Sequence, residues 1–139
     1  NPPRAGSTVY NRCLSEFWKG RSIVEDMVLL SMAASAVCVG CLVPNRWLPP
    51  LPNDKFLHFA SFALLAALAL RVAEGPRLAM FWLLGLFVAG CLIECLQSLV
   101  PDRRFCWRDI LANTAGIGFV AAAAQLYVTF SEVLFQNAP

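Results

Sequence analysis

Charged residues are scarce in this sequence. Asp, Glu, Lys and Arg make up 14% of the 139 residues, against about 25% in an ordinary soluble domain. The net charge is only +2, which is too small to favour binding to nucleic acid. A phosphate-binding loop, a nucleophile elbow and an HExxH zinc motif are all absent, so the sequence predicts no cofactor and we assign no metal ion.

Apolar residues dominate instead. They make up 58% of the chain, and the mean hydropathy is +0.61. Four of the six cysteines lie inside apolar runs, where cysteine packs as a small hydrophobic residue. Cys38 and Cys41 form a C-x-x-C pair but lack the flanking polar residues of a redox or zinc motif. The composition therefore predicts a membrane protein, and the length predicts a single domain.

Four apolar segments have the length of a membrane span. A helix needs about 20 residues to cross about 30 Å of hydrocarbon. Pro44 ends the first segment, and Glu74-Gly75-Pro76 separates the second from the third, which predicts antiparallel neighbours. The segments are 23–43, 54–73, 77–100 and 109–130. We therefore expect an all-α integral membrane protein, a bundle of four transmembrane helices with short connections.

Two short segments flank this domain of residues 23–130. Residues 1–22 are basic and carry Phe17 and Trp18, which is typical of a juxtamembrane arm with an interfacial anchor. Residues 1–12 have no apolar core, so we expect no signal peptide. Residues 131–139 form a tail whose SEVLFQ resembles the recognition sequence of a picornaviral 3C-type protease, and the sequence leaves open whether this tail is native. Six of the 11 basic residues fall on the side of both termini, which weakly favours cytoplasmic termini.

Polar side chains recur at helical spacing near one end of the last three segments. An ionisable group at the centre of a membrane helix costs roughly 2.5 to 3.5 kcal/mol on insertion scales, so it is a functional-site hypothesis by default. Residues three or four apart share a helix face, and the helical rise places the three faces in one shallow layer. The faces are Asp54, His58 and Ser61; Glu94 and Gln97; and Asp109, Asn113 and Gly116. The alternative is a hydrogen-bonded cluster that only stabilises the bundle.

Small residues accompany the third of these faces. Ala112 and Gly116 form a small-x-x-x-small pair, and Gly118 follows closely. Such pairs allow two membrane helices to approach closely. We therefore expect the fourth segment to pack tightly against a neighbour in this region.

The spaced polar residues resemble the VanZ-like family of small bacterial membrane proteins. The resemblance covers residues 54–116, and the first helix and the basic arm lie outside it. The matching patterns are Asp54-Lys55-x-x-His58-Phe59-x-x-Phe62, then Glu94-x-x-Gln97 with Pro101 and Arg103, then Asp109-x-x-x-Asn113-x-x-Gly116. The resemblance implies a multi-span protein of the cell envelope, in the bacterial inner membrane, and a link to glycopeptide resistance, but no established reaction. Cys106 stands where a Ser or another small polar residue is expected, so no role that needs a hydroxyl is carried over.

The first functional hypothesis is lipid binding. Basic residues would lie at headgroup level above the carboxylates and the imidazole, and arginine pairs bidentately with phosphate. The expected ligand-binding residues are Asp54, Lys55, Gln97, Arg103, Arg104 and Asn113, with Arg108 as a further rim residue. The partners would be membrane lipids or a lipid-linked phosphate or glycan. The alternative for the arginines is anchoring to lipid phosphates and charge balance.

Two other hypotheses stay open. In the first, the protein is a membrane hydrolase or transferase with His58 as general base or nucleophile, Glu94 as acid and Asp109 as a third catalytic residue. The same three side chains could also hold a divalent metal. In the second, the protein is a non-catalytic subunit that docks another membrane protein, or a copy of itself, through its small-residue helix faces.

Overall fold

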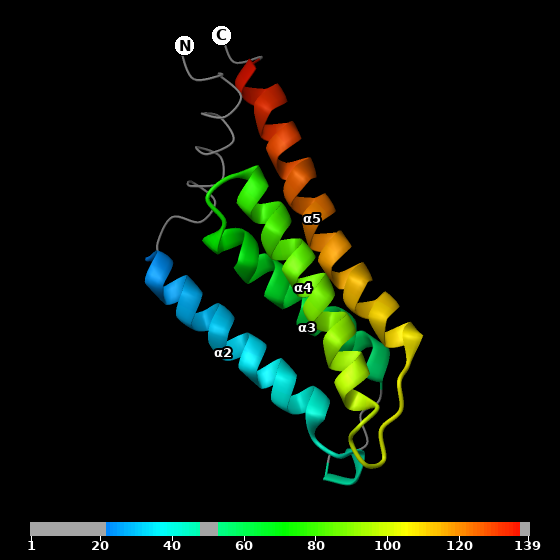
Figure 1. Ribbon diagram of the computed structural model, residues 1–139. Coiled ribbons are helices and arrows are strands. Elements are labelled where there is room, and N and C mark those ends of the chain that lie inside the picture. The colour runs from blue at the N-terminus through cyan, green and yellow to red at the C-terminus, as the bar shows by residue number, and fades with distance from the viewer. Residues whose placement is uncertain (1–21, 48–52, 137–139) are drawn as a thin grey trace.

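The computed structural model describes residues 22–47 and 53–136, which form helices and contain no strand. The elements are α2 (Ile23–Leu42), the 3-10 helix η1 (Asn45–Trp47), α3 (Asp54–Val72), α4 (Pro76–Gln97) and α5 (Trp107–Gln136). Each of the four α-helices is long and apolar enough to cross a membrane. The predicted all-α bundle of four transmembrane helices is therefore confirmed (Figure 1).

Local sequence explains where the helices begin. Ser22 and Glu25 form a capping box at α2, since each side chain accepts a hydrogen bond from the backbone N–H of the other, at 3.3 and 3.2 Å. Asn53 caps α3 by accepting from the Phe56 N–H at 3.2 Å. Gly75, with φ of 100°, makes the turn that delivers Pro76 to the first position of α4, a position that suits proline. These caps satisfy N–H groups that a helix cannot bond internally.

The helix ends differ modestly from the predicted spans. The largest difference is in α5, which begins at Trp107 rather than Asp109 and continues to Gln136 rather than ending at 130. The SEVLFQ segment is therefore helical, and it contains no proline or glycine that would end a helix. Residues 1–21, prolines 49, 50 and 52, and residues 137–139 lie outside the described residues.

Helix α3 is the centre of the bundle. It packs most extensively against α5 and also contacts α2 and α4, whereas in the described part of the chain α2 does not contact α5. Phe62, 1% exposed, lies between α4 and α5 with Ile93 and Ile117. A Cβ built on Gly116 would overlap the backbone carbonyl oxygen of Phe59, so only glycine allows this approach. The close packing predicted around Gly116 is confirmed, while Gly118 faces open space.

An ion pair and an apolar cluster hold α2 to α3 at the other end of the bundle. Arg71 Nε donates to Oδ1 of the buried Asp26 at 2.9 Å. Leu30 packs beside this pair in a cluster with Leu65, Ala69 and Val72. The first turn of α2 also carries Glu25 and Asp26, where carboxylates suit the positive end of the helix dipole.

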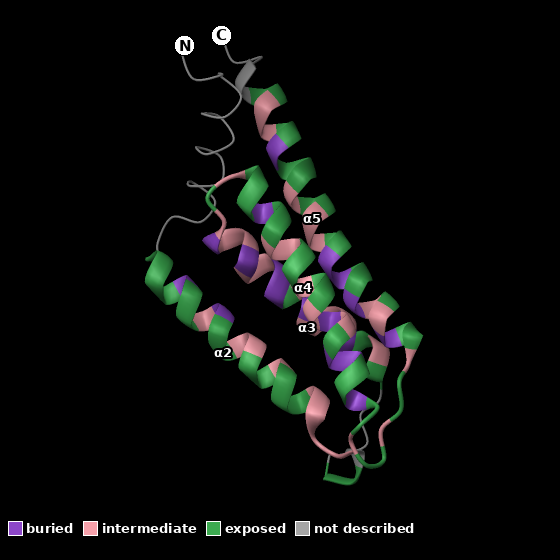
Figure 2. Ribbon diagram, viewed as in Figure 1, coloured by how far each residue is buried: buried purple, intermediate pink, exposed green. Residues whose placement is uncertain are grey.

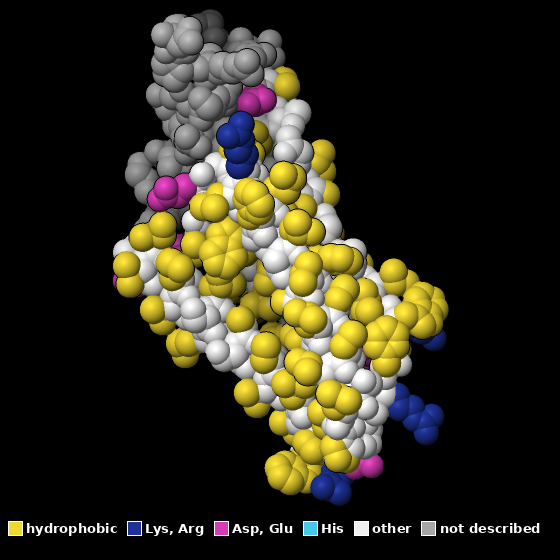
Figure 3. All heavy atoms as spheres, in the orientation of Figure 1, with side chains coloured by type: hydrophobic (Ala, Val, Ile, Leu, Met, Phe, Trp, Pro, Cys, Tyr) yellow, Lys and Arg dark blue, Asp and Glu magenta, His cyan; other side chains and the backbone are white. Residues whose placement is uncertain are grey.

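The outer surface is apolar, as a membrane span requires. Many large hydrophobic side chains are exposed on all four α-helices, and buried positions concentrate on the sides that face other helices (Figure 2). In the space-filling view, hydrophobic side chains cover the middle of the molecule and charged side chains lie toward its two ends (Figure 3). Lipid tails can solvate such a surface at no cost, whereas water cannot.

Candidate functional site

Buried polar side chains gather at the end of the bundle where α3 and α5 begin and α4 ends. Five of the six buried polar residues in the described part of the chain lie there, and Asp26 is the sixth. They come from three helices, as the sequence predicts: His58 from α3, Glu94 and Gln97 from α4, Asp109 and Asn113 from α5. The spacing within each helix therefore places these side chains on the faces that meet.

His58 is at the centre of this layer. Its side chain is 6% exposed, and Nδ1 lies 3.0 Å from Oδ1 of Asn113. Three carboxylates surround the ring at the same distance of 3.9 Å: Glu94 Oε1 faces Nδ1, whereas Asp54 Oδ1 and Asp109 Oδ2 face Nε2. One imidazole is thus placed among three acidic groups from three helices.

Lys55 joins the two carboxylates that face Nε2. Its ammonium group forms an ion pair with Oδ1 of Asp109 and lies 3.4 Å from Oδ2 of Asp54. Asp109 is buried, whereas the Asp54 side chain is 53% exposed. The lysine that we expected to face a headgroup is therefore part of the acidic cluster in this structure.

Glu94 and Gln97 form the deepest part of the layer. Glu94 has no solvent exposure, and neither carboxylate oxygen accepts a hydrogen bond of normal geometry from a described residue. The His58 Nδ1 atom lies 3.9 Å from Oε1, and the backbone N–H of Cys106 also faces this carboxylate. Gln97 is also buried, and its Nε2 lacks an acceptor among the described residues. A buried polar group without a hydrogen-bond partner destabilises the fold. Residues that serve only to stabilise a fold rarely lack such partners.

The three arginines of the α4–α5 connection and α5 lie in different surroundings. Arg103 donates from Nε to the Val43 carbonyl at 3.0 Å and from Nη2 to the Gly40 carbonyl at 3.1 Å. These are carbonyls at the end of α2, where the helix has no internal donors for them. Arg104 and Arg108 are exposed. Arg103 is therefore built into the bundle, while the other two are at its surface.

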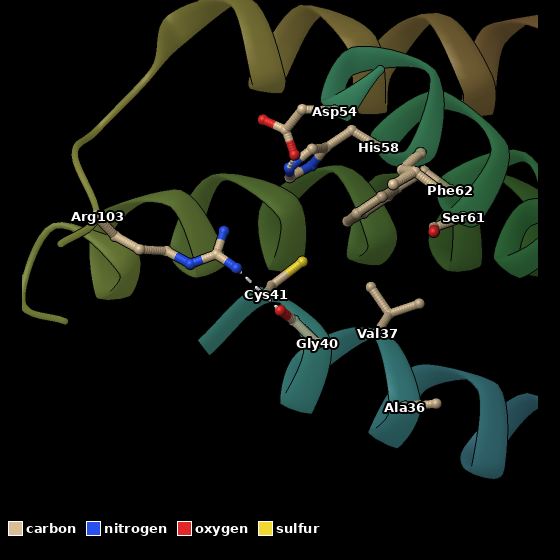
Figure 4. Close-up of a pocket in the computed structure, with 10 residues that line it drawn as sticks. Ala36, Val37, Gly40, Cys41, Asp54, His58, Ser61, Phe62 and Arg103 are labelled. Atoms are coloured by element: carbon tan, nitrogen blue, oxygen red, sulfur yellow. Dashed lines mark hydrogen bonds and ion pairs between the residues drawn. The ribbon is translucent and has the colours of Figure 1, made fainter. Parts of the chain in front are cut away.

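A cavity of about 310 Å³ lies between α2 and α3 beside this layer. Its apolar wall includes Val37 and Phe62, and its polar end is formed by Asp54, His58 and Arg103. Figure 4 shows Arg103 reaching from the α4–α5 connection to Gly40 at the end of α2. Ser61, predicted on the same face as Asp54 and His58, also lines it. The cavity is thus apolar along its length and charged at one end.

The sequence did not indicate that α2 forms one side of the cavity. Ala36, Val37, Gly40 and Cys41 form one side of the cavity, yet α2 carries no polar residue at this depth that would mark a site. Of its small residues, Ala36 and Gly40 line the cavity and leave room for it. Small residues alone are common in membrane helices, so they do not distinguish a cavity from close packing.

The residues that best fit a metal ion differ from the expected set. One ligand atom each of Asp54, His58 and Asp109 lies within 4.8 Å of the others. Glu94, which we considered as a ligand with His58 and Asp109, faces the other ring nitrogen of His58. One imidazole and two carboxylates match the ligand preference of divalent transition metals.

These features define a multi-pass helical membrane protein with a buried polar site at one end of its bundle. Residues 42–129, more than half of the chain, match the family described as VanZ/LLP1. The chain belongs to this family, which confirms the resemblance seen in the sequence. No curated protein and no solved structure matches the chain. The match includes every predicted site residue and excludes nearly all of α2.

Proposed function

We propose that the protein binds a lipid with an anionic or glycan headgroup in the cavity between α2 and α3. The observation that carries this proposal is the division of the cavity into an apolar wall and a charged end. An acyl or isoprenoid chain would pack against the apolar wall formed by Val37, Phe62 and Ala36, because contact between apolar surfaces is favourable. The headgroup would then lie beside Asp54, His58 and Arg103.

The charged end has complementary groups for such a headgroup. Two of the five N–H groups of the Arg103 guanidinium bind α2 carbonyls, and the others can donate to phosphate oxygens. The half-exposed Asp54 carboxylate can accept hydrogen bonds from sugar hydroxyls. The remaining expected ligand residues do not line the cavity; they are Lys55, Gln97, Arg104 and Asn113.

We further propose that the site serves the bacterial cell envelope, in the inner membrane, with both termini in the cytoplasm. The small excess of basic residues on the side of the termini supports this orientation. In that orientation the site faces the outer leaflet, where a lipid-linked envelope precursor is available.

A second candidate function is hydrolysis or group transfer at the same headgroup. The observation that favours it is His58 Nε2, which lies beside two carboxylates at the polar end of the cavity. An imidazole in this position can act as a general base. Glu94 and Asp109 would be the other catalytic residues. Turnover of the bound lipid, measured by mass spectrometry, distinguishes this function from binding alone.

The test is native mass spectrometry of the protein purified in gentle detergent. We expect the wild type to retain a phospholipid or glycolipid. Ser61→Phe, which fills the cavity from α3, should lose it. Ser35→Phe is the matched control, because Ser35 is exposed and its hydroxyl donates only to the Ser31 carbonyl of its own helix.

The arginines give a second comparison. Arg103→Ala should lose the retained lipid and Arg104→Ala should lose less of it, since only Arg103 lines the cavity. If the wild type carries no specific lipid, or if Ser61→Phe retains as much as Ser35→Phe, the cavity is not a lipid site.

A further inference from the structure

We propose that Asp54, His58 and Asp109 bind one divalent cation at the polar end of the cavity. One donor atom from each residue lies within 4.8 Å of the others. The three residues come from the first two turns of α3 and the first turn of α5, and the close packing of these helices at Gly116 fixes their positions. This inference does not rest on lipid binding, because metal binding can be measured with no lipid added.

The tautomer of His58 turns a lone pair toward this position. The Asn113 Oδ1 atom is a carbonyl oxygen and can only accept, so the 3.0 Å hydrogen bond requires the proton on Nδ1. In the neutral ring Nε2 then carries the lone pair. A hydrogen bond from the second nitrogen to a carbonyl is the usual way in which proteins orient a metal-binding histidine.

Nε2 has no donor of its own in the described part of the chain. The groups that face it are two carboxylate oxygens, Asp54 Oδ1 and Asp109 Oδ2, each at 3.9 Å. When the ring is neutral, three lone-pair atoms therefore converge on one point. A cation among the three atoms relieves their repulsion, as a proton on Nε2 also would.

Lys55 orients the two carboxylates for this role. It contacts the other oxygen of each one, Oδ2 of Asp54 and Oδ1 of Asp109. The oxygens that face Nε2 are left available as ligands. The lysine thus neutralises part of the negative charge from outside the ligand position and does not occupy it.

The formal charges leave the ligand position negative. Ionised Asp54 and Asp109 contribute −2 and Lys55 contributes +1, which leaves −1 beside a neutral His58. Glu94 faces the opposite ring nitrogen, Nδ1, and is not a ligand. A divalent cation is attracted to this negative position, and electrostatic attraction is strong where water is excluded.

The imidazole and carboxylate ligands favour some divalent metals over others. One imidazole and two carboxylates suit Mn²⁺, Fe²⁺ or Zn²⁺ better than Ca²⁺, which takes oxygen ligands only. Asp54 and His58 also line the cavity, so the open coordination positions of the ion would face it. A phosphate or a water molecule in the cavity could then bind to the metal.

The test uses the full chain in detergent, stripped with a chelator and titrated separately with Mn²⁺ and Zn²⁺. Bound Mn²⁺ is followed by the loss of the electron paramagnetic resonance signal of the free ion, and Zn²⁺ by calorimetry. We expect one ion per chain for at least one of the two metals. Asp54→Asn is the main variant, because this ligand is half-exposed and its replacement leaves the buried layer in place. It should weaken binding at least 10-fold.

Three further variants separate binding from folding. Asn113→Ala should weaken binding about 10- to 100-fold, as loss of an outer-shell partner does, whereas Asn113→Asp keeps an acceptor oxygen and should restore most of it. Glu25→Gln removes a carboxylate from the other end of α2 and should bind as the wild type does. The proposal is overturned if neither metal binds at one ion per chain, or if Asp54→Asn binds as tightly as Glu25→Gln.

Discussion

Asn113 Oδ1 accepts a hydrogen bond from Nδ1 of His58, 55 residues away in the sequence, at 3.0 Å. This contact joins α3 to α5 inside the bundle, where both side chains are buried. It also decides which nitrogen of the ring carries the proton. A single amide therefore links the packing of two helices to the chemistry of the site.

Replacing Asn113 by alanine should destabilise the bundle. The change leaves Nδ1 of His58 buried without this acceptor, which costs about 1–3 kcal/mol. Thermal unfolding in detergent, followed by circular dichroism, measures the loss. Thr114→Ala is the neighbouring control, because the Thr114 hydroxyl is exposed and donates only to the Ile110 carbonyl of its own helix. Equal stability of the two variants would contradict the structural importance of the His58–Asn113 contact.

Gly116→Ala should separate α5 from α3. The added Cβ would overlap the Phe59 carbonyl oxygen, and forcing extra volume into a packed position costs about 1–3 kcal/mol. The matched control is Gly118→Ala, since nothing lies within 4 Å of its built Cβ. This second change should stabilise α5 by up to about 1 kcal/mol through helix propensity. Denaturation of both variants side by side tests the opposite signs.

Arg71→Leu should destabilise the other end of the bundle. It leaves the buried Asp26 carboxylate without the Nε contact at 2.9 Å, and breaking a buried ion pair on one side costs about 3–5 kcal/mol. Adding Asp26→Asn to Arg71→Leu should recover part of the loss, because no charge is then left buried. Arg77→Leu, at an exposed position, should have little effect. A double variant no more stable than Arg71→Leu would argue against this ion pair.

Arg103→Ala should loosen the end of α2. The arginine binds the carbonyls of Gly40 and Val43, which a helix end leaves without donors. Hydrogen–deuterium exchange of backbone amides in the last turn of α2 should rise, while exchange in α3 stays unchanged. Arg104→Ala removes the same charge from an exposed neighbour and should leave α2 protected. Equal exchange in both variants would show that Arg103 does not cap this helix.

Much of the bundle and the polar layer could be predicted from sequence because both depend on helical periodicity. Apolar length gives the spans, and spacings of three or four give the faces that carry His58, Glu94, Asp109 and Asn113. Proline and glycine mark the connections. The end of α5 is harder to place, since residues 131–136 are compatible with a helix but also resemble a protease recognition sequence.

The pairing of atoms within the layer could not be predicted. Spacing suggests that Asp54 can reach His58, but it does not show that Lys55 joins Asp54 to Asp109, because that contact depends on how α3 and α5 pack. The same holds for Arg103, whose acceptors are the backbone carbonyls of Gly40 and Val43. Every residue has a backbone carbonyl, so the sequence does not show which carbonyls will accept a hydrogen bond. The cavity depends on α2, which has no polar residue beside it.

Helix α2 is closely packed along its first half, and the cavity lies beside its last turns. Asp26, Leu30 and Val37 pack against the rest of the bundle, whereas Arg103 both binds the end of α2 and lines the cavity. Because α2 contacts α3 and α4 but not α5 in the described part of the chain, its end beside the cavity can move outward without disturbing the α3–α5 packing. We therefore expect α2 to act as the movable side of a lateral entrance, through which a molecule passes directly from the lipid phase to the polar layer.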